Sequence, residues 1–336
     1  MRFSKLNLKI LIPLIAVMLV ACDIRTEKQT APKMESVRIG IAKTPPSWLF
    51  IIADKKSFLK KNGINADITY FKSGKRALNG LLANKVDIAT TAGGPIVFQS
   101  LLRNDFSIFA TIGTSSNDNV IVAARNKGIK TPDDLKGKRM ATQEASASHF
   151  FMHLCLTEHG FSESDIHPLY MKVEKLPKAL VDGTVDAIST REPYYSEAVK
   201  ALGENAIVFE TPGLYLKFFQ LVGFNSYLNN NLSIQTKILK ALVDSENFVK
   251  NNKQEAIKLI SDSLDIPEIN VIKALFTLEL NVKLEQSLIL SLEDQARWVI
   301  NRNSKNKYSM PNYLQFISSK ALSIVKPQAI SILHSN

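Results

Sequence analysis

A pattern of alternating strands and helices, which occurs twice along the chain, constrains the fold more than any other feature of the sequence. In the first series, residues 64–71 (INADITYF) carry apolar side chains at every second position, as a half-buried strand does. The next segment, 74–85, places its apolar residues on one helical face. Because strands that alternate with helices form parallel sheets, this series predicts a mostly parallel sheet with helices on both faces.

A second series of the same kind begins near residue 126. Its segment 178–190 (KALVDGTVDAIST) parallels residues 79–90 (NGLLANKVDIAT), and each reads as a helix, a turn and a strand that opens with Val-Asp. From Thr236 onward, helical patterns dominate. Two α/β units followed by a helical return predict two lobes, and ligands of such sheets bind beside the carboxyl ends of the strands.

The first 21 residues have the pattern of an export signal. Three cations precede an apolar run, residues 10–20, that is too short to span a bilayer as a mature helix. The run ends in Leu19-Val20-Ala21-Cys22, which resembles the lipobox of bacterial lipoproteins and implies that Cys22 is acylated and becomes the first mature residue. The alternative is an ordinary signal peptide in which Cys22 is incidental.

The segment 22–36 follows as a flexible tether, because it has few apolar residues. The lipobox resemblance implies a protein anchored on the periplasmic side of the inner membrane, or on the cell surface, depending on the organism.

The charge balance argues against nucleic acid as a partner. The net charge is +11, and loss of the three cations in residues 1–21 leaves +8, but the cations are scattered and no basic patch is interleaved with aromatic residues. The net positive charge indicates only a general attraction for small anions or for anionic lipid. Beyond Cys22 there is one more cysteine, Cys155, in an apolar stretch that favours a buried, inert thiol.

The sequence predicts no enzyme, no cofactor and no metal site. It contains no GxSxG, HExxH, CxxC or P-loop pattern. His149 and His153 have the i, i+4 spacing of metal ligands, but no third ligand lies near them in the sequence.

Several phrases resemble one family. Residues 37–94, 129–166 and 180–198 (LVDGTVDAISTREPYYSEA), together with 282–298 and 311–333, are similar to the periplasmic substrate-binding proteins of the nitrate/sulfonate/taurine ABC importers. That family also includes binders of a thiamine pyrimidine precursor. Arg191 stands where the family commonly has tryptophan.

The resemblance implies a bilobal type II periplasmic binding protein fold of the α/β class, with two hinge strands and a helical C-terminal region. The expected hinges lie near 120–126 and 217–225. Residues 37–122 and 220–336 would form lobe 1, and residues 123–219 lobe 2. The implied partners are a small solute and the permease and ATPase subunits of an ABC importer, with the chain itself a monomer.

We expect the ligand-binding site to be lined by residues at the carboxyl ends of strands, where hydroxyls, helix amides and a guanidinium can bind an anion. The candidates are Trp48, Gly93, Gly94, Pro95, Thr114, Ser115, Ser146, Ser148, His149, Arg191, Glu192, Tyr194 and Tyr215.

Each candidate also has a purely structural interpretation. Trp48 and His149 suit core packing, the serines suit a helix cap, and Thr114 and Ser115 suit a turn. Glu192 suits either a ligand amine or a pairing with Arg191.

The residues leave the solute open. A sulfonate, taurine or nitrate would use helix amides and Arg191, whereas an aminopyrimidine would use Trp48, the tyrosines and Glu192. Arg191 favours an anionic or zwitterionic solute. A pyrimidine-synthase-like enzyme is the third alternative. The export signal argues against it, and so does the absence of a cysteine cluster from the sequence.

Overall fold

The computed structural model describes residues 34–302 and 308–333, which belong to one compact unit. The predicted signal segment, Cys22 and most of the predicted tether lie outside these residues. The last tether residues are already part of a sheet, because β1 spans Glu35–Ala42 and pairs Glu35 with Ile64. No helix of the described residues is long and apolar enough to cross a membrane.

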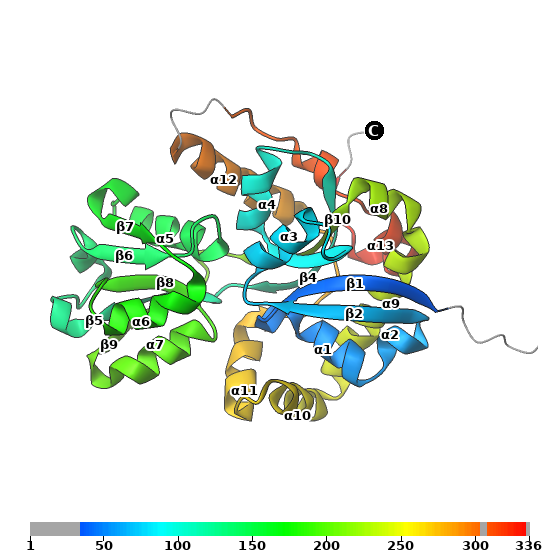
Figure 1. The fold of residues 1–336 in the computed structure, drawn as a ribbon, viewed down its shortest axis with the longest axis horizontal. Helices are drawn as coiled ribbons and strands as arrows, with labels where there is room; N and C mark the ends of the chain where they lie inside the picture. Colours follow the sequence, from blue (N-terminus) through cyan, green and yellow to red (C-terminus); the bar gives the residue numbers. More distant parts are fainter. Residues whose placement is uncertain (1–33, 303–307, 334–336) are drawn as a thin grey trace, which may run out of the picture. The chain divides into compact units, whose positions relative to one another are not determined.

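The first sheet has the strand order β11-β4-β10-β3-β1-β2 (Figure 1). Its parallel part consists of β1 between β2 and β3, and β10 runs antiparallel to both β3 and β4. The strands other than β1 are β2 (Ile64–Phe71), β3 (Ile88–Ala92), β4 (Phe106–Ser115), β10 (Lys217–Phe224) and β11 (Leu278–Glu279).

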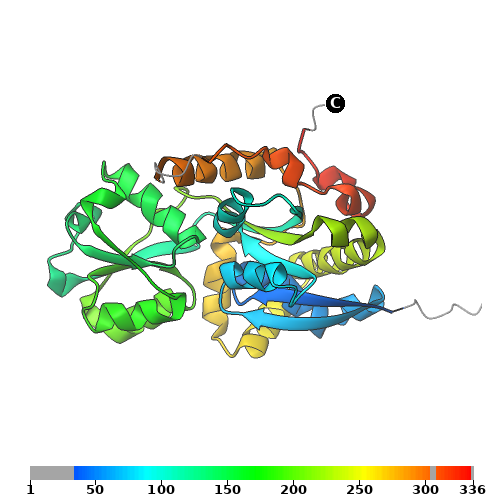
Figure 2. The ribbon, with the colours of Figure 1, turned by 45° about the horizontal axis from the view of Figure 1, so that its top comes forward.

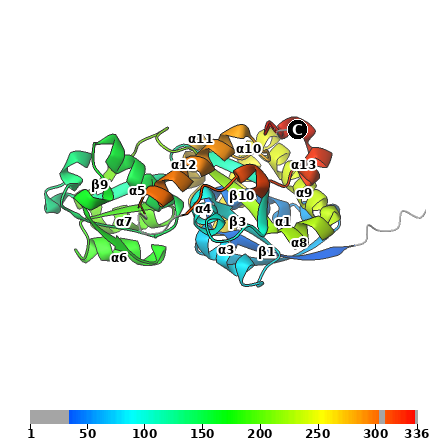
Figure 3. The ribbon, with the colours of Figure 1, turned by 90° about the horizontal axis from the view of Figure 1, so that it is seen from above.

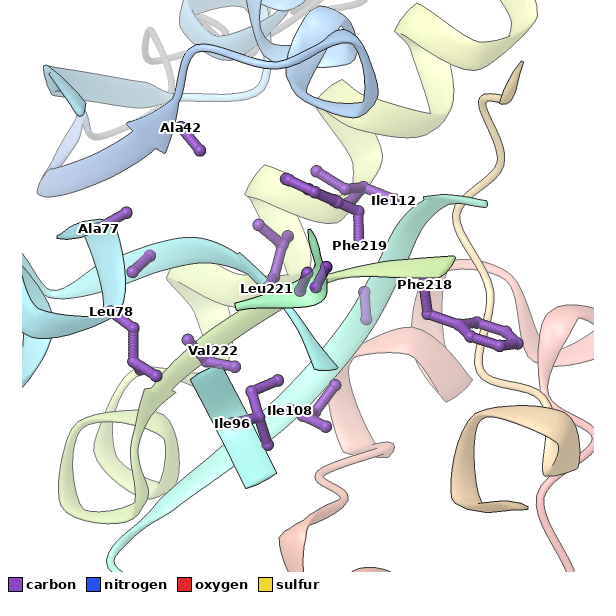
Figure 4. Close-up of a cluster of buried hydrophobic side chains, with 14 of the residues drawn as sticks. Ala42, Ala77, Leu78, Ile96, Ile108, Ile112, Phe218, Phe219, Leu221 and Val222 are labelled. Carbon is purple, nitrogen blue, oxygen red and sulfur yellow. The ribbon is translucent and has the colours of Figure 1, made fainter. Parts of the chain in front are cut away.

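Helices cover both faces of this sheet. Figure 1 shows α3 (Gly74–Leu82) and α4 (Gly93–Ser100) on one face, and α1 (Trp48–Lys55), α2 (Phe58–Lys61) and α9 (Leu232–Asn251) on the other. The strands supply fully buried apolar side chains to the core between these layers. In Figure 4, Ile96 of α4 lies beside Ile108 and Val222 of the sheet, all three with no exposed surface.

The second sheet has the order β7-β6-β8-β5-β9. Strands β6, β7 and β8 are parallel, and β5 runs antiparallel to β8 and β9. On β5, Ile121 belongs to the apolar cluster that includes α5 (Ala147–Glu158), and Val122 to the cluster that includes α6 (Leu176–Val181) and α7 (Tyr194–Leu202). The strands are β5 (Asn119–Ala124), β6 (Arg139–Thr142), β7 (His167–Tyr170), β8 (Ala187–Arg191) and β9 (Ala206–Phe209).

The sheets are less parallel than predicted, because each sheet takes in one strand that arrives directly from the other. Residues 116–118 join β4 to β5, and residues 210–216 join β9 to β10. Connections this short cannot hold the helix that a parallel crossover needs. The predicted lobe boundaries, at 122/123 and 219/220, fall inside β5 and β10. We propose that the lobes divide instead in the two connecting segments.

The helical return starts earlier than Thr236, at α8 (Asn225–Asn230). It continues through α9 to α10 (Lys253–Leu264), α11 (Glu268–Thr277), α12 (Gln286–Arg302) and α13 (Lys320–Val325). Helix α12 runs alongside α4 (Figure 2, Figure 3). Residues 48–61 form two helices, α1 and α2, because Ser57 between them has a φ of 58°. Short 3-10 turns lie at Pro45–Ser47, Arg125–Lys127, Pro132–Leu135, Glu163–Asp165, Val173–Lys175, Gly203–Asn205, Tyr313–Phe316 and Pro327–Ala329.

Candidate functional site

Three helix N-termini meet where the two sheets face each other. At the start of α4, Gly94 lies so close to α5 that a Cβ atom there would be 2.8 Å from the carbonyl carbon of Ser146, the N-cap of α5. At the start of α3, a Cβ on Gly74 would lie 3.1 Å from Cα of Thr91, just before α4. The positive ends of three helix dipoles therefore converge, and such an arrangement favours a negative group.

Hydrogen bonds tie this cluster of helix starts together. Gln143, which follows β6, donates from Nε2 to Oγ of Ser73, the N-cap of α3, at 3.3 Å. Ser146 Oγ accepts from the amide of His149 and donates to the Gln143 carbonyl at 2.6 Å. The cap that the sequence predicts at Ser146 is therefore present.

Arg191 adds a buried cation beside the helix starts. It is the last residue of β8 and is 6% exposed. Its guanidinium donates to two carbonyls, Glu192 O at 2.9 Å and Lys72 O at 3.2 Å, and Lys72 directly precedes the N-cap of α3. Burial lowers the pKa of Arg191, against the opposing charge of Asp118. Among the described residues no carboxylate lies within ion-pair distance of it. A buried cation that lacks a counter-ion is costly, so an anion bound here would be stabilised.

A second buried cation nearby is already neutralised. Lys217 opens β10 and forms a close ion pair with Asp118, and the two side chains are 2% and 6% exposed. Burial lowers the pKa of Lys217, and the charge of Asp118 opposes this change. The pair leaves Arg191 as the surplus positive charge.

Buried polar atoms near these charges lack partners. The Oγ1 atoms of Thr44, after β1, and Thr190, before Arg191, make no hydrogen bond within the described part of the chain. The same holds for both amide atoms of Gln220 on β10, which pairs in register with Thr91. Because buried polar groups are normally satisfied, such atoms indicate positions where a ligand or water binds.

Two adjoining cavities lie next to this cluster. One has a volume of about 300 Å³ and includes Trp48 and Tyr70 in its walls, and the other has a volume of about 410 Å³ and includes Asp118 and Tyr195. Both are lined by Glu192, whose pKa is raised by burial, and by Ser196, which donates to Glu192 Oε1 at 2.6 Å.

The structure brings many of the predicted residues to this region. Gly93, Gly94 and Ser146 belong to the helix starts, and Tyr194 lies with its ring 5.7 Å from the guanidinium carbon of Arg191. Pro95 is the third residue of α4 rather than the first, because the helix already begins at Gly93. Trp48, Ser115 and Glu192 line the cavities, and Thr114 donates to Glu279 at 3.2 Å.

The remaining three predicted residues have partners of their own. Ser148, in the first turn of α5, donates to Asn119 Oδ1 at 2.8 Å, and Asn119 pairs in register with Arg191. His149 has no exposed surface, and its Nε2 lies 3.3 Å from Glu163. Tyr215 packs against Phe150 and lines a different cavity of about 490 Å³, beside α12.

Sequence reasoning missed several residues of the cluster. Ser73 follows β2, so the rule that ligands bind at carboxyl ends of strands applies to it too. Asp118 and Lys217 are 99 positions apart, and no local pattern indicates their pairing.

The described residues contain no group of three or more His, Cys, Asp or Glu side chains that could hold a metal ion. Burial raises the pKa of the Cys155 thiol to about 11, which removes it as a nucleophile at neutral pH.

Two α/β sheets joined by two connecting segments define the periplasmic binding protein fold. The chain belongs to the NMT1/THI5-like family, whose model matches residues 45–256. The structure is similar to that of the alkanesulfonate-binding protein SsuA from Xanthomonas axonopodis pv. citri bound to MOPS, with a TM-score of 0.74, 21% identity, and coverage of 85% of this chain and 99% of that one.

Two relatives are named as aliphatic sulfonates-binding proteins. The one from Escherichia coli (strain K12) is 26% identical over 69% of this chain and 73% of its own length. The one from Bacillus subtilis (strain 168) is 27% identical over 76% of this chain and 78% of its own length. Both names describe binding proteins rather than enzymes.

Proposed function

We propose that this protein is the solute-binding component of an ABC importer and that it holds a small anionic solute, of the sulfonate type, between its lobes. The observation that carries the proposal is Arg191, a buried guanidinium whose hydrogen-bond acceptors among the described residues are two carbonyls and which lies beside three helix N-termini. A sulfonate offers a guanidinium two acceptor oxygens at once and offers further oxygens to the helix amides. The names of the two relatives support the same class of solute.

The remaining parts of the proposal concern delivery. Acyl chains on Cys22 would hold the protein on the periplasmic side of a membrane, and the segment after Cys22 would let it reach the importer. The protein would act as a monomer and release the solute to a permease driven by an ATPase.

A thiamine pyrimidine precursor is the second candidate, and the cavity of about 300 Å³ is the observation that favours it. Trp48 and Tyr70 give this cavity aromatic walls, and Glu192 could accept a hydrogen bond from an amine. Such a solute would not need Arg191.

Calorimetric titration of the protein, freed of co-purified solute by unfolding and refolding, tests the proposal. We expect butanesulfonate to bind and an aminopyrimidine not to bind. Binding of the aminopyrimidine together with no detectable binding of sulfonates, taurine or nitrate would replace the first candidate by the second.

A further inference from the structure

The cavity of about 300 Å³ has walls that suit the carbon skeleton of a solute better than its charge. Its larger aliphatic and aromatic side chains come mainly from β1, α1, the end of α10 and the α10–α11 connection, and they include Ile41, Trp48, Ile51, Leu264 and Ile266. Trp48 is 3% exposed, so its ring lines the cavity from within the core. An apolar cavity of about 150 Å³ accepts benzene in a protein core, so this one has room for a ring with substituents.

The cavity borders the proposed anion site. Glu192 lines the cavity and directly follows Arg191, whose guanidinium contacts the carbonyl of Lys72. Tyr70 also lines the cavity and lies two residues before Lys72 in the sequence. In the arrangement inferred below, a solute with its anionic group at Arg191 extends its body into the cavity.

Polar side chains line part of the cavity, and they belong to Lys43, Thr44, Ser47, Ser196 and Asn270, together with Glu192 and the Tyr70 hydroxyl. Thr44 Oγ1 is buried and has no hydrogen-bond partner among the described residues. Burial raises the pKa of Glu192. The cavity thus suits a body that is mainly apolar and carries one or two hydrogen-bonding groups.

Both sheets contribute to the walls. Glu192, Pro193 and Ser196 come from the β8–α7 region, and the remaining lining residues come from the lobe that contains the first sheet. A body that fills the cavity would contact both lobes and so favour the arrangement in which they meet.

We infer that this cavity selects the solute by its carbon skeleton: the preferred solute is an organic anion with a ring-sized apolar body, rather than nitrate or taurine. This inference rests on the proposed function, since it places the anionic group at Arg191. Nitrate has no body to place in the cavity, and the two-carbon chain of taurine covers little of its apolar lining.

The test is a titration of one protein with methanesulfonate and benzenesulfonate, which share an anionic group and differ in body. We expect benzenesulfonate to bind at least about tenfold more tightly, from the apolar area that the ring buries. The variant Ala274→Phe fills the cavity from α11 and should reduce this ratio to about one. Phe276→Ala, at a side chain that is 79% exposed on the same helix, is the control and should leave the ratio unchanged.

A second measurement needs no cavity variant. The sequence has two tryptophans, so Trp298→Phe leaves Trp48 as the fluorescent reporter, and benzenesulfonate should shift its emission while methanesulfonate should not. Equal affinities for both sulfonates, or a Trp48 emission that does not shift on addition of benzenesulfonate, would overturn the inference without affecting the proposed function. No binding of either sulfonate would overturn the proposed function itself.

Discussion

At the scale of single residues, the proposed site depends on one charge that has no ion pair among the described residues. Within that part of the chain Arg191 donates to two carbonyls, whereas the neighbouring Lys217 is neutralised by Asp118. An anion that reaches Arg191 gains charge-assisted hydrogen bonds without displacing an ion pair. A planar guanidinium also fixes the orientation of a bound sulfonate, which a lysine ammonium does not.

We therefore predict that Arg191→Ala weakens sulfonate binding by about 2–5 kcal/mol, and that Arg191→Lys weakens it at least about tenfold despite keeping the charge. Calorimetric titration measures both changes. Arg297→Ala is the matched control, because Arg297 forms surface ion pairs on α12 and its side chain is 53% exposed. An unchanged affinity in Arg191→Ala would remove this residue from the site.

A second charged cluster joins α12 to the lobe of the second sheet. Glu163 accepts from Tyr170 at 2.8 Å and from Arg302 of α12 at 3.1 Å, and His149 lies beside it. Burial by itself would raise the pKa of Glu163. The hydrogen bonds and charges of His149, Tyr170 and Arg302 outweigh burial and lower this pKa to about 2.

A lowered carboxylate pKa stabilises the folded protein above the unfolded pKa and loses this effect as the pH falls toward the folded value. Glu163→Gln should therefore lower the free energy of unfolding near neutral pH by about 3 kcal/mol at most. The difference from the original protein should shrink between about pH 4.5 and pH 2. Denaturant titrations across this range measure it, with Glu158→Gln, at an exposed position, as control. A difference that grows with acid would contradict the assignment.

At the scale of elements, the starts of α4 and α5 meet through backbone contact. Gly94 permits this, because its missing side chain leaves room for the Ser146 carbonyl. The approach brings the dipoles of both helices to one point, where they act on the same ligand.

Gly94→Ala should push the two helix starts apart, because its Cβ would lie 2.9 Å from the Ser146 carbonyl oxygen. Overpacking of this kind costs about 1–3 kcal/mol, and we expect it to appear as weaker solute binding. Gln99→Ala, on the same helix and away from the contact, should bind as the original protein does. If Gly94→Ala kept full affinity, the meeting of α4 and α5 would not be part of the binding arrangement.

At the scale of the compact unit Met34–Asn336, polar contacts join the elements of the two sheets. Arg76 of α3 pairs with Glu174 at 2.7 Å, and Lys75 donates to the Glu144 carbonyl at 2.8 Å. We propose that the lobes hinge at the two short connections, 116–118 and 210–216, which adjoin the ranges 120–126 and 217–225 expected from the sequence. A solute that contacts both lobes would shift the population toward the closed state.

The sequence predicts local structure well and long-range structure poorly. The strand 64–71 and the Ser146 cap follow from alternation and capping, which act over a few residues. The break at Ser57 requires a positive φ that no residue pattern there indicates. The antiparallel entry of β5 and β10 and the Asp118–Lys217 pair depend on contacts between distant segments, so they emerge only from the folded chain.

The most direct test of the central claim is a crystal structure of the protein with butanesulfonate. The account predicts sulfonate oxygens about 2.7–2.9 Å from the guanidinium nitrogens of Arg191, beside the N-termini of α3, α4 and α5. A sulfonate bound elsewhere, with Arg191 still held only by the carbonyls of Lys72 and Glu192, would contradict it.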